Sequence, residues 1–413
     1  METHRRVAGK PQEPAGLSEA RPPDGARPGP RAAGSRCKPL WVKLRIANLD
    51  RELEVLPGRS LLEAAFAAGL NVPHSCRGGN CGSCAALLLE GEYFYPNGIP
   101  LGLTEQQRAH GQVLLCQVRA RSDITVEISL PVSADDIAIK RLPARIEHCE
   151  PLAHDVLRVT LRLPIAESFS FQAGQYLDVL LPGGRRRSFS IASAPGSAPL
   201  LELQIRRAVG GEFTEALFAA VSAGVMRGTM PAAASGAMSS EAADVSLERA
   251  LRSALLTIEG PLGQFRYHES AAPMLLVGGG TGLAPLDSIM RHVIERNLKR
   301  PMRLFWGCRA ARDLYADARL RGYVRQGALQ EYVPVLSEAA ESFGGEHGLV
   351  HQAVLRRIAD LDRYDVYAAG PPAMIAAVRR EFAARGAQQI HFDSFDYAPD
   401  ALERQRSAAA STS

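Results

Sequence analysis

Four cysteines at a fixed spacing constrain this chain more than any other feature. Three follow a CxxxxCxxC pattern and the fourth comes after 31 intervening residues, which gives Cys76, Cys81, Cys84 and Cys116. Four thiolates at this spacing are the ligands of a [2Fe-2S] cluster, and the glycines between them allow a tight loop whose N–H groups point at sulfur. A zinc site would show paired CxxC units or spaced histidines, and a Rieske centre would need two histidine ligands. The pattern predicts a centre that carries single electrons.

Composition indicates the cellular compartment of such a chain. The sequence has 7 cysteines in 413 residues, few for a disulfide-rich secreted protein, and it contains no apolar run of membrane-spanning length and no signal peptide. We therefore expect a cytoplasmic protein without membrane contact. Residues 1–37 hold seven basic and four acidic side chains, so they carry +3 of the net charge of +4. The remainder is nearly neutral, which argues against a nucleic-acid partner.

Shifts in composition and pattern divide the chain. The first residues are rich in Pro, Gly and Arg and cannot bury enough apolar surface to fold. The expected parts are a disordered extension 1–38, an iron-sulfur domain 39–130, a flavin domain 137–268 with an insertion loop 221–247, a nucleotide domain 269–400 and a disordered tail 401–413.

The segment around the cysteines has the pattern of a small β-rich domain. Strands are expected at Trp41–Ile46 and Glu52–Val55, and the capping box Ser60 to Glu63 opens a helix directly before the cysteine loop. A strand Val113–Ala120 is expected to deliver Cys116. These residues resemble plant-type ferredoxins over the whole segment, and the resemblance implies a β-grasp fold. His74 precedes the loop and is interpreted as an ordinary histidine, because the ligand set is complete without it.

A second motif, Arg187-Ser188-Phe189-Ser190, lies between predicted strands. It resembles the RxYS motif of ferredoxin-NADP reductase-like flavoproteins, which implies an antiparallel β-barrel that binds FAD. Arg187 can hold the flavin pyrophosphate, Phe189 can pack on the flavin, and the Ser190 hydroxyl is the expected catalytic group near flavin N5. Further along, Gly211 and Thr214 begin a helix whose N–H groups and hydroxyl can bind the pyrophosphate.

A third motif is an apolar strand followed by a glycine-rich turn and a helix, which is the physical pattern of a dinucleotide-phosphate site. It resembles the GGTGxAP turn of the same reductases and implies a parallel α/β NAD(P)-binding domain. The expected nucleotide-binding residues are Gly279, Gly280, Thr281, Gly282, Gly370 and Pro371. Near the end of the chain, Phe395 is either a flavin-facing ring or an ordinary buried side chain of an edge strand.

Together the motifs predict an enzyme. NADH donates two electrons as hydride, the cluster accepts one at a time, and FAD joins the two steps. The domain order resembles reductase components of bacterial multicomponent oxygenases and CDP-6-deoxy-3,4-glucoseen reductases, which implies a separate oxygenase or dehydrase partner. NADPH is an alternative donor, since Arg309 and Arg312 could bind its extra phosphate.

Two departures from the family pattern leave a different function open. Phe189 replaces the commoner tyrosine, and Ala369 stands where many relatives carry a cysteine. The alternative is a non-enzymatic iron-sulfur electron carrier or redox sensor with inactive flavin and nucleotide modules.

Overall fold

The computed structural model describes most of the chain beyond residue 40. The described residues are 41–70, 72–74, 77–79, 82–100, 102–128, 138–182, 185–223, 254–340 and 342–395. The predicted extension and tail, residues 224–247 of the predicted insertion, and the ligands Cys76 and Cys81 lie outside them. In the described part of the chain, no helix is long and apolar enough to cross a membrane.

The first sheet is mixed and carries the cysteine region. Its strand order is β2-β1-β7-β3-β5, with only β1 and β7 parallel among these pairs. The strands are β1 (Val42–Ile46), β2 (Arg51–Val55), β3 (Ala85–Glu90), β5 (Gln112–Leu114) and β7 (Ile124–Ile128), with a small ribbon of β4 (Tyr93–Phe94) and β6 (Arg119–Ala120). Helix α1 (Leu61–Ala67) begins at the predicted capping box, which is confirmed by reciprocal Ser60 and Glu63 hydrogen bonds. Helix α2 (Glu105–Ala109) is also capped, by Thr104 and Gln107.

The predicted strand Val113–Ala120 is wrong in its middle. Strand β5 ends at Leu114 and β6 begins at Arg119, and the turn between them is closed by hydrogen bonds from Gln117 and Val118 N–H to the Leu114 carbonyl. Leu114, Leu115 and Cys116 are buried in succession. A half-buried strand would expose every second side chain, so a turn is what allows this run to bury together. Cys116 therefore lies on a turn.

The second sheet is antiparallel throughout, in the order β11-β10-β13-β8-β9-β12. Its strands are β8 (Lys140–Ala153), β9 (Val156–Arg162), β10 (Tyr176–Leu180), β11 (Arg186–Ser190), β12 (Leu200–Arg206) and β13 (Leu255–Leu262). Helix α3 (Glu212–Ser222) buries Phe213, Leu217 and Val221 in the core of this sheet. Among the described residues, an isolated bridge pairs Ile191, the residue after β11, with Leu203 of β12.

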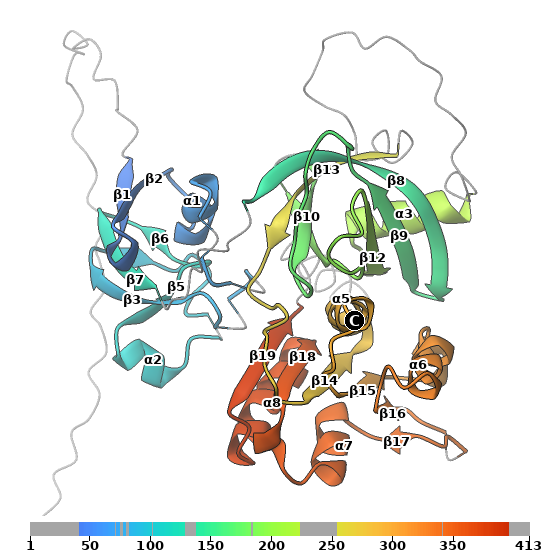
Figure 1. The fold of residues 1–413 in the computed structure, drawn as a ribbon. Coiled ribbons are helices and arrows are strands. Elements are labelled where there is room, and N and C mark those ends of the chain that lie inside the picture. Colours follow the sequence, from blue (N-terminus) through green and yellow to red (C-terminus); the bar gives the residue numbers. More distant parts are fainter. Residues whose placement is uncertain are drawn as a thin grey trace, which may run out of the picture. The chain divides into compact units, whose positions relative to one another are not determined.

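The third sheet is parallel throughout, in the order β17-β16-β15-β14-β18-β19 (Figure 1). Its strands are β14 (Met274–Gly279), β15 (Met302–Cys308), β16 (Glu331–Leu336), β17 (Glu346–His347), β18 (Asp365–Gly370) and β19 (Gln389–Ser394). Helices α5 (Leu283–Glu295) and α6 (Asp317–Arg325) share one apolar core with the sheet, while α7 (Val350–Arg357) and α8 (Pro372–Ala384) share another. Both faces of the sheet are covered, as parallel sheets require.

Strand order explains where this third sheet can bind a ligand. The chain leaves β14 toward β15 on one side, and β18 lies on the other side. Ligands bind at the carboxyl ends of strands where the order reverses in this way. The glycine-rich turn after β14 and the Gly370-Pro371 turn after β18 meet at this position.

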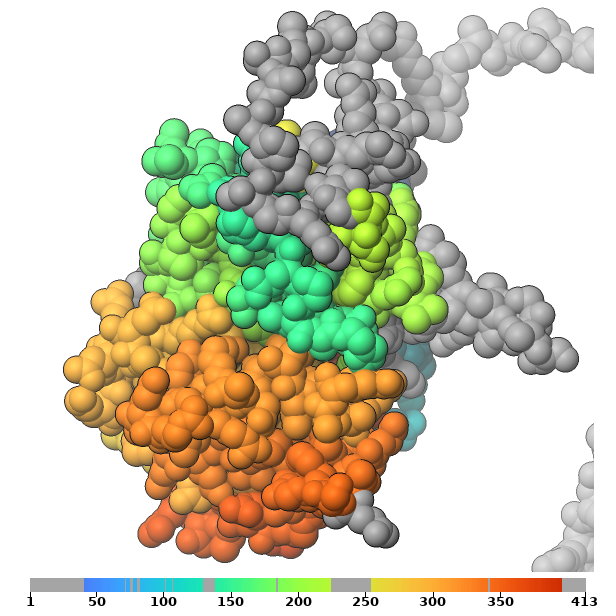
Figure 2. Space-filling model, turned by 90° about the vertical axis from the view of Figure 1, so that its right-hand side faces the viewer, coloured from blue at the N-terminus to red at the C-terminus, as the bar shows by residue number. Residues whose placement is uncertain are grey.

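The second and third sheets are joined by buried polar contacts. Gln204 on β12 donates to the Asp287 carboxylate on α5 at 3.0 Å, and the Ser288 hydroxyl donates to the Ser193 carbonyl at 2.7 Å. Asp287 is fully buried and is held further by Arg291 and Arg319. Figure 2 shows the yellow-to-red residues of the third sheet against the green residues of the second. Because an unpaired buried carboxylate is costly, this network fixes the contact.

A histidine of the third sheet gives a pH dependence of stability. Burial, followed by the neighbouring His268, lowers the pKa of His391 from 6.5 to about 4. The unfolded chain binds this proton below its ordinary pKa while the folded chain does not, so stability is lost as the pH falls from 6.5 toward 4. Because His391 is partly exposed, we expect a loss of about 1–2 kcal/mol between pH 7 and pH 5.

Urea unfolding at both pH values measures the loss in the wild type and in His391→Phe, where it should be smaller by this amount, because other histidines whose pKa burial lowers, such as His351, still contribute. His347→Phe, at an exposed position of β17, is the control. If all three proteins lose the same stability, His391 does not cause the dependence.

Candidate functional site

Two of the four predicted cluster ligands lie in the described residues, and the structure brings their segments together. Cys84 and Cys116 are buried, at 3% and 6% exposure. The Leu115 N–H donates to the Cys84 carbonyl at 3.0 Å, which ties the turn that carries Cys116 to the segment before β3. Two buried thiols on adjacent segments suit shared ligation of a cluster.

The cysteine loop needs its glycines. Gly79 and Gly82 have φ of +82° and +76°, a region that residues with a Cβ rarely adopt. A Cβ on Gly79 would lie 2.8 Å from both Gln117 Cγ and Pro100 Cβ, and one on Gly82 would lie 2.8 Å from the Gly102 carbonyl oxygen. The loop is therefore drawn tightly against the segment that supplies Cys116, and these residues fit a [2Fe-2S] cluster.

Four of the predicted flavin residues line one cavity of about 570 Å³. Arg187 and Phe189 reach it from β11, Gly211 and Thr214 from the start of α3, and Cys116 from the cluster turn. The cavity thus joins the residues predicted for two different cofactors. Ser190 pairs with Tyr176 of β10 and is not among the described residues that line the cavity.

The start of helix α3 forms a close-fitting anion cradle. A Cβ on Gly211 would lie 2.8 Å from Thr214 Oγ1 and 2.9 Å from the Ala208 carbonyl oxygen, so glycine is required there. Among the described residues no side chain caps this helix, which leaves first-turn N–H groups for an anion. The Thr214 hydroxyl accepts from the Ala208 N–H at 3.1 Å and lies 3.2 Å from its carbonyl oxygen, so it also holds the preceding turn. The arrangement fits the pyrophosphate of FAD.

The predicted nucleotide residues meet at a second cavity, of about 680 Å³. Its lining includes Gly279, Gly280, Thr281, Pro371 and Phe395. Phe395 thus lies at this cavity, and its N–H donates to the Gly370 carbonyl at 3.0 Å. A strand end, a glycine-rich turn and a helix start fit the phosphates of a dinucleotide.

Gly282 and Gly370 act through packing. A Cβ on Gly282 would lie 2.0 Å from the Ala369 carbonyl oxygen, and one on Gly370 would lie 3.0 Å from Met374 Cε. The turns after β14 and β18 can therefore approach this closely only because position 282 is glycine, while a Cβ on Gly370 would lie 3.2 Å from Gly279 Cα and would require a smaller shift.

Arg206, at the end of β12, lines both cavities. Its Nε donates to Asp155 Oδ2 at 2.7 Å, and a Cβ on Gly280 would lie 3.2 Å from its Nη1. Sequence reasoning missed this residue. The available signal was a cation at the end of a predicted strand, four residues before the Gly210-Gly211 turn.

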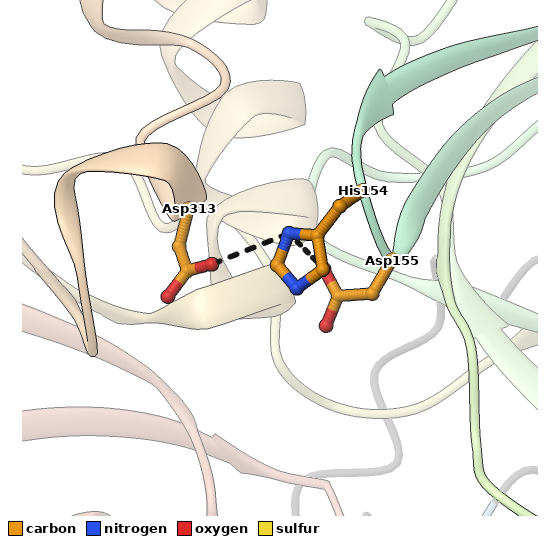
Figure 3. Close-up of side chains that lie close together, drawn as sticks. All are labelled: His154, Asp155 and Asp313. Atoms are coloured by element: carbon orange, nitrogen blue, oxygen red, sulfur yellow. Dashed lines mark ion pairs between the residues drawn. The ribbon is translucent and has the colours of Figure 1, made fainter.

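A histidine and two aspartates lie close together (Figure 3), and one of them, Asp155, pairs with this arginine. His154 Nδ1 lies 3.8 Å from Asp155 Oδ1 and 3.6 Å from Asp313 Oδ1. Asp155 is already paired with Arg206, and Asp313 accepts from the Ala310 N–H at 3.0 Å. The group is best explained as support for Arg206 and for the contact between the turn before β9 and the segment after β15.

Comparison with known proteins matches three domains to this chain. A 2Fe-2S iron-sulfur cluster binding domain matches residues 44–121, an oxidoreductase FAD-binding domain matches 143–267, and an oxidoreductase NAD-binding domain matches 276–380. A Yersinia pestis CDP-6-deoxy-L-threo-D-glycero-4-hexulose-3-dehydrase reductase is 33% identical over 340 residues, 82% of this chain and 93% of the relative. The chain belongs to the ferredoxin-NADP reductase-like iron-sulfur flavoprotein reductases.

Other proteins similar to this chain are also reductases. Reductase component 2 of terephthalate 1,2-dioxygenase from Comamonas sp is 30% identical over 86% of this chain and 98% of its own length. The crystal structure of the Amycolatopsis cytochrome P450 reductase GcoB aligns with a TM-score of 0.66 at 30% identity, covering 86% of this chain and 99% of that one. The reductase is therefore an NAD(P)H-dependent flavin and iron-sulfur oxidoreductase. We refer to the three matched ranges as the 2Fe-2S, FAD and NAD domains.

Arg187 gives a direct test of the FAD site. A hydrogen bond to a charged group contributes about 1.5–3 kcal/mol, so we expect Arg187→Leu to weaken FAD binding roughly 10- to 100-fold. Fluorescence titration of the flavin-free protein with FAD measures the change. Arg207→Leu is the matched control, because Arg207 is exposed and pairs with Glu215 at 2.6 Å. An unchanged dissociation constant in Arg187→Leu would remove Arg187 from the site.

Proposed function

We propose that this reductase takes electrons from NADH at the cavity of the NAD domain and delivers them, through FAD and the [2Fe-2S] cluster, to a separate oxygenase or dehydrase component. The observation that carries the proposal is that Cys116 lines the same cavity as Arg187 and Phe189, while Arg206 lines that cavity and the nucleotide cavity as well. FAD, when bound, accepts a hydride and releases electrons singly, which reconciles a two-electron donor with a one-electron acceptor.

The roles of the protein side chains follow from their positions. Arg187, Gly211 and the N-terminus of α3 would hold the flavin pyrophosphate, with Phe189 packed on the flavin. The turn Gly279 to Gly282 and the Gly370-Pro371 turn would hold the dinucleotide, with Arg206 beside it. We assign Ser190 the catalytic position near the flavin, on the motif alone. Phe395 lines the NAD cavity and would contact the flavin from that side.

We favour NADH over NADPH. Two arginines were considered for the extra phosphate of NADPH. Of these, Arg309 lines the nucleotide cavity and Arg312 is not among the described lining residues, so only one of the two could bind that phosphate here. Arg380 also lines this cavity but pairs with Glu381 at 2.7 Å, so these two side chains add no net positive charge for a further phosphate.

We propose domain limits of 39–130, 137–268 and 269–400, a β-grasp topology for the first and a closed barrel for the second. The mixed first sheet with one main helix and the Ile191 to Leu203 bridge support these assignments. We place the protein in the cytoplasm, because cluster thiolates need a reducing compartment.

An anaerobic absorbance titration of the purified protein with NADH and then NADPH tests the function. Bleaching of the flavin together with the iron-sulfur bands is expected with NADH first. Intact cofactor bands that neither coenzyme bleaches would instead support the electron carrier or redox sensor, for which Phe189 and Ala369 are the motivation.

A further inference from the structure

Arg77, the residue after the first cluster cysteine, reaches from the 2Fe-2S domain into the FAD domain. Its Nη1 donates to Oδ2 of Asp178 on β10 at 2.5 Å. The Asp178 side chain is fully buried and that of Arg77 is 19% exposed. A carboxylate without access to water is tolerated only with charged or hydrogen-bonding partners, and Arg77 supplies one from the 2Fe-2S domain beside Arg186 of the FAD domain, which lies 3.4 Å from the same oxygen.

The Arg77 guanidinium is also held between aromatic rings of both domains. Its Cζ lies 4.6 Å from the ring centre of Phe66, on α1, and 5.4 Å from that of Tyr176, on β10. The ring of His74 lies edge-on to both rings, at centre distances of 4.6 and 5.7 Å. Cation and ring contacts of this kind are stronger when water is excluded. The side chain is thus oriented by both domains at once.

The contact is connected at each end to a predicted cofactor site. On one side, Gln117, which follows Cys116, donates from Nε2 to the Arg77 carbonyl at 3.0 Å. On the other, Ser188 of the flavin motif donates its hydroxyl to Asp178 Oδ1 at 2.7 Å. Three consecutive polar contacts therefore connect the turn that carries Cys116 with β11, the strand that carries Arg187 and Phe189.

We propose that the Arg77 to Asp178 contact docks the 2Fe-2S domain on the FAD domain and thereby sets the geometry in which electrons pass from flavin to cluster. Arg77 is a positioning residue in this role. Each passage moves one electron from the reduced flavin to the oxidised cluster, two passages follow each NADH, and no bond between heavy atoms forms or breaks. The inference rests on the proposed function and adds the residues that hold the two domains in contact.

Arg77→Leu in the full-length holoprotein tests the proposal with two kinds of measurement. Small-angle scattering of the oxidised protein should show a larger radius of gyration, because the 2Fe-2S domain leaves its docked position. After rapid mixing with NADH, cluster reduction should slow by about ten- to a hundred-fold, since small misplacements have effects of this size. Flavin bleaching by NADH should change less than cluster reduction.

Three further variants separate docking from damage. Arg77→Lys keeps the charge without the planar fork and should be intermediate in both measurements. Arg45→Leu removes an exposed ion pair of the same domain, 3.7 Å from Asp50, and should match the wild type. Iron content and the paramagnetic signal of the reduced cluster report whether Arg77→Leu assembles its cluster. If it does not, Asp178→Asn tests the contact from the FAD domain.

Two results would overturn the proposal. One is an unchanged radius of gyration with unchanged cluster reduction in a variant whose cluster is complete. The other is an equal fall in flavin bleaching and cluster reduction, which would indicate damage to the FAD site. Failure of NADH to bleach the wild-type flavin would instead refute the proposed function, so the two failures are distinguishable.

Discussion

Replacing Cys116 by alanine is expected to abolish NADH-driven electron delivery to a protein acceptor such as cytochrome c. Loss of a group that merely supports a metal ligand costs about 10- to 100-fold in affinity, so loss of the ligand itself should leave less than about 1% of the rate. The iron-sulfur absorption bands should disappear. Reduction of ferricyanide, which can draw electrons from the flavin directly, should persist.

Cys149→Ala is the matched control for this variant. Cys149 lies in the FAD domain with the same 6% exposure as Cys116, and burial raises its pKa to about 12, so it stays an unreactive thiol. The control should keep the cluster bands and the rate with cytochrome c. Cluster bands that survive in Cys116→Ala would remove Cys116 from the ligand set.

Replacing Gly282 by alanine is expected to abolish flavin reduction by NADH. The added Cβ would lie 2.0 Å from the Ala369 carbonyl oxygen and 2.5 Å from its carbon, and both atoms belong to backbone that cannot swing away. Overpacking in a core commonly costs about 1–3 kcal/mol, and a clash with backbone should exceed that range. The turns after β14 and β18 must then separate, which opens the predicted nucleotide site.

Stopped-flow absorbance with NADH, compared with dithionite, measures the effect in Gly282→Ala. Dithionite needs no nucleotide site, so it should still bleach the flavin. Gly344→Ala is the control, because no atom lies within 4 Å of its added Cβ and Gly344 is exposed. A wild-type rate with NADH in Gly282→Ala would show that the turn tolerates the separation.

Local chemistry explains why much of the fold was predictable. A capping box is complete within four residues, and Ser60 with Glu63 formed the predicted helix start. The apolar strand and glycine-rich turn before α5 are equally local, and β14 and α5 lie where the pattern indicates. The long strands β8 and β13 were not anticipated. They pair with each other across more than 100 residues, which leaves no local pattern, although β8 also pairs with the adjacent β9.

Tertiary contacts account for the errors and omissions at the site. Cys116 was expected on a strand, yet burial of the consecutive residues Leu114 to Cys116 required a turn. The parallel pairing of β18 with β19 brings Phe395 to the NAD cavity, and its contact with the flavin stays a prediction. In each case the neighbours that decide the position come from other parts of the chain.

The sequence by itself determined the cofactor set, because ligand spacing and glycine-rich turns are chemical requirements met within short segments. It could not determine which residues lie between the cofactors. Arg206 reaches both cavities only after β12 packs beside the glycine-rich turn, and Arg77 meets Asp178 across 101 residues of chain. Such contacts depend on how the sheets pack against one another, and the attraction between paired charges strengthens only once that packing has excluded water.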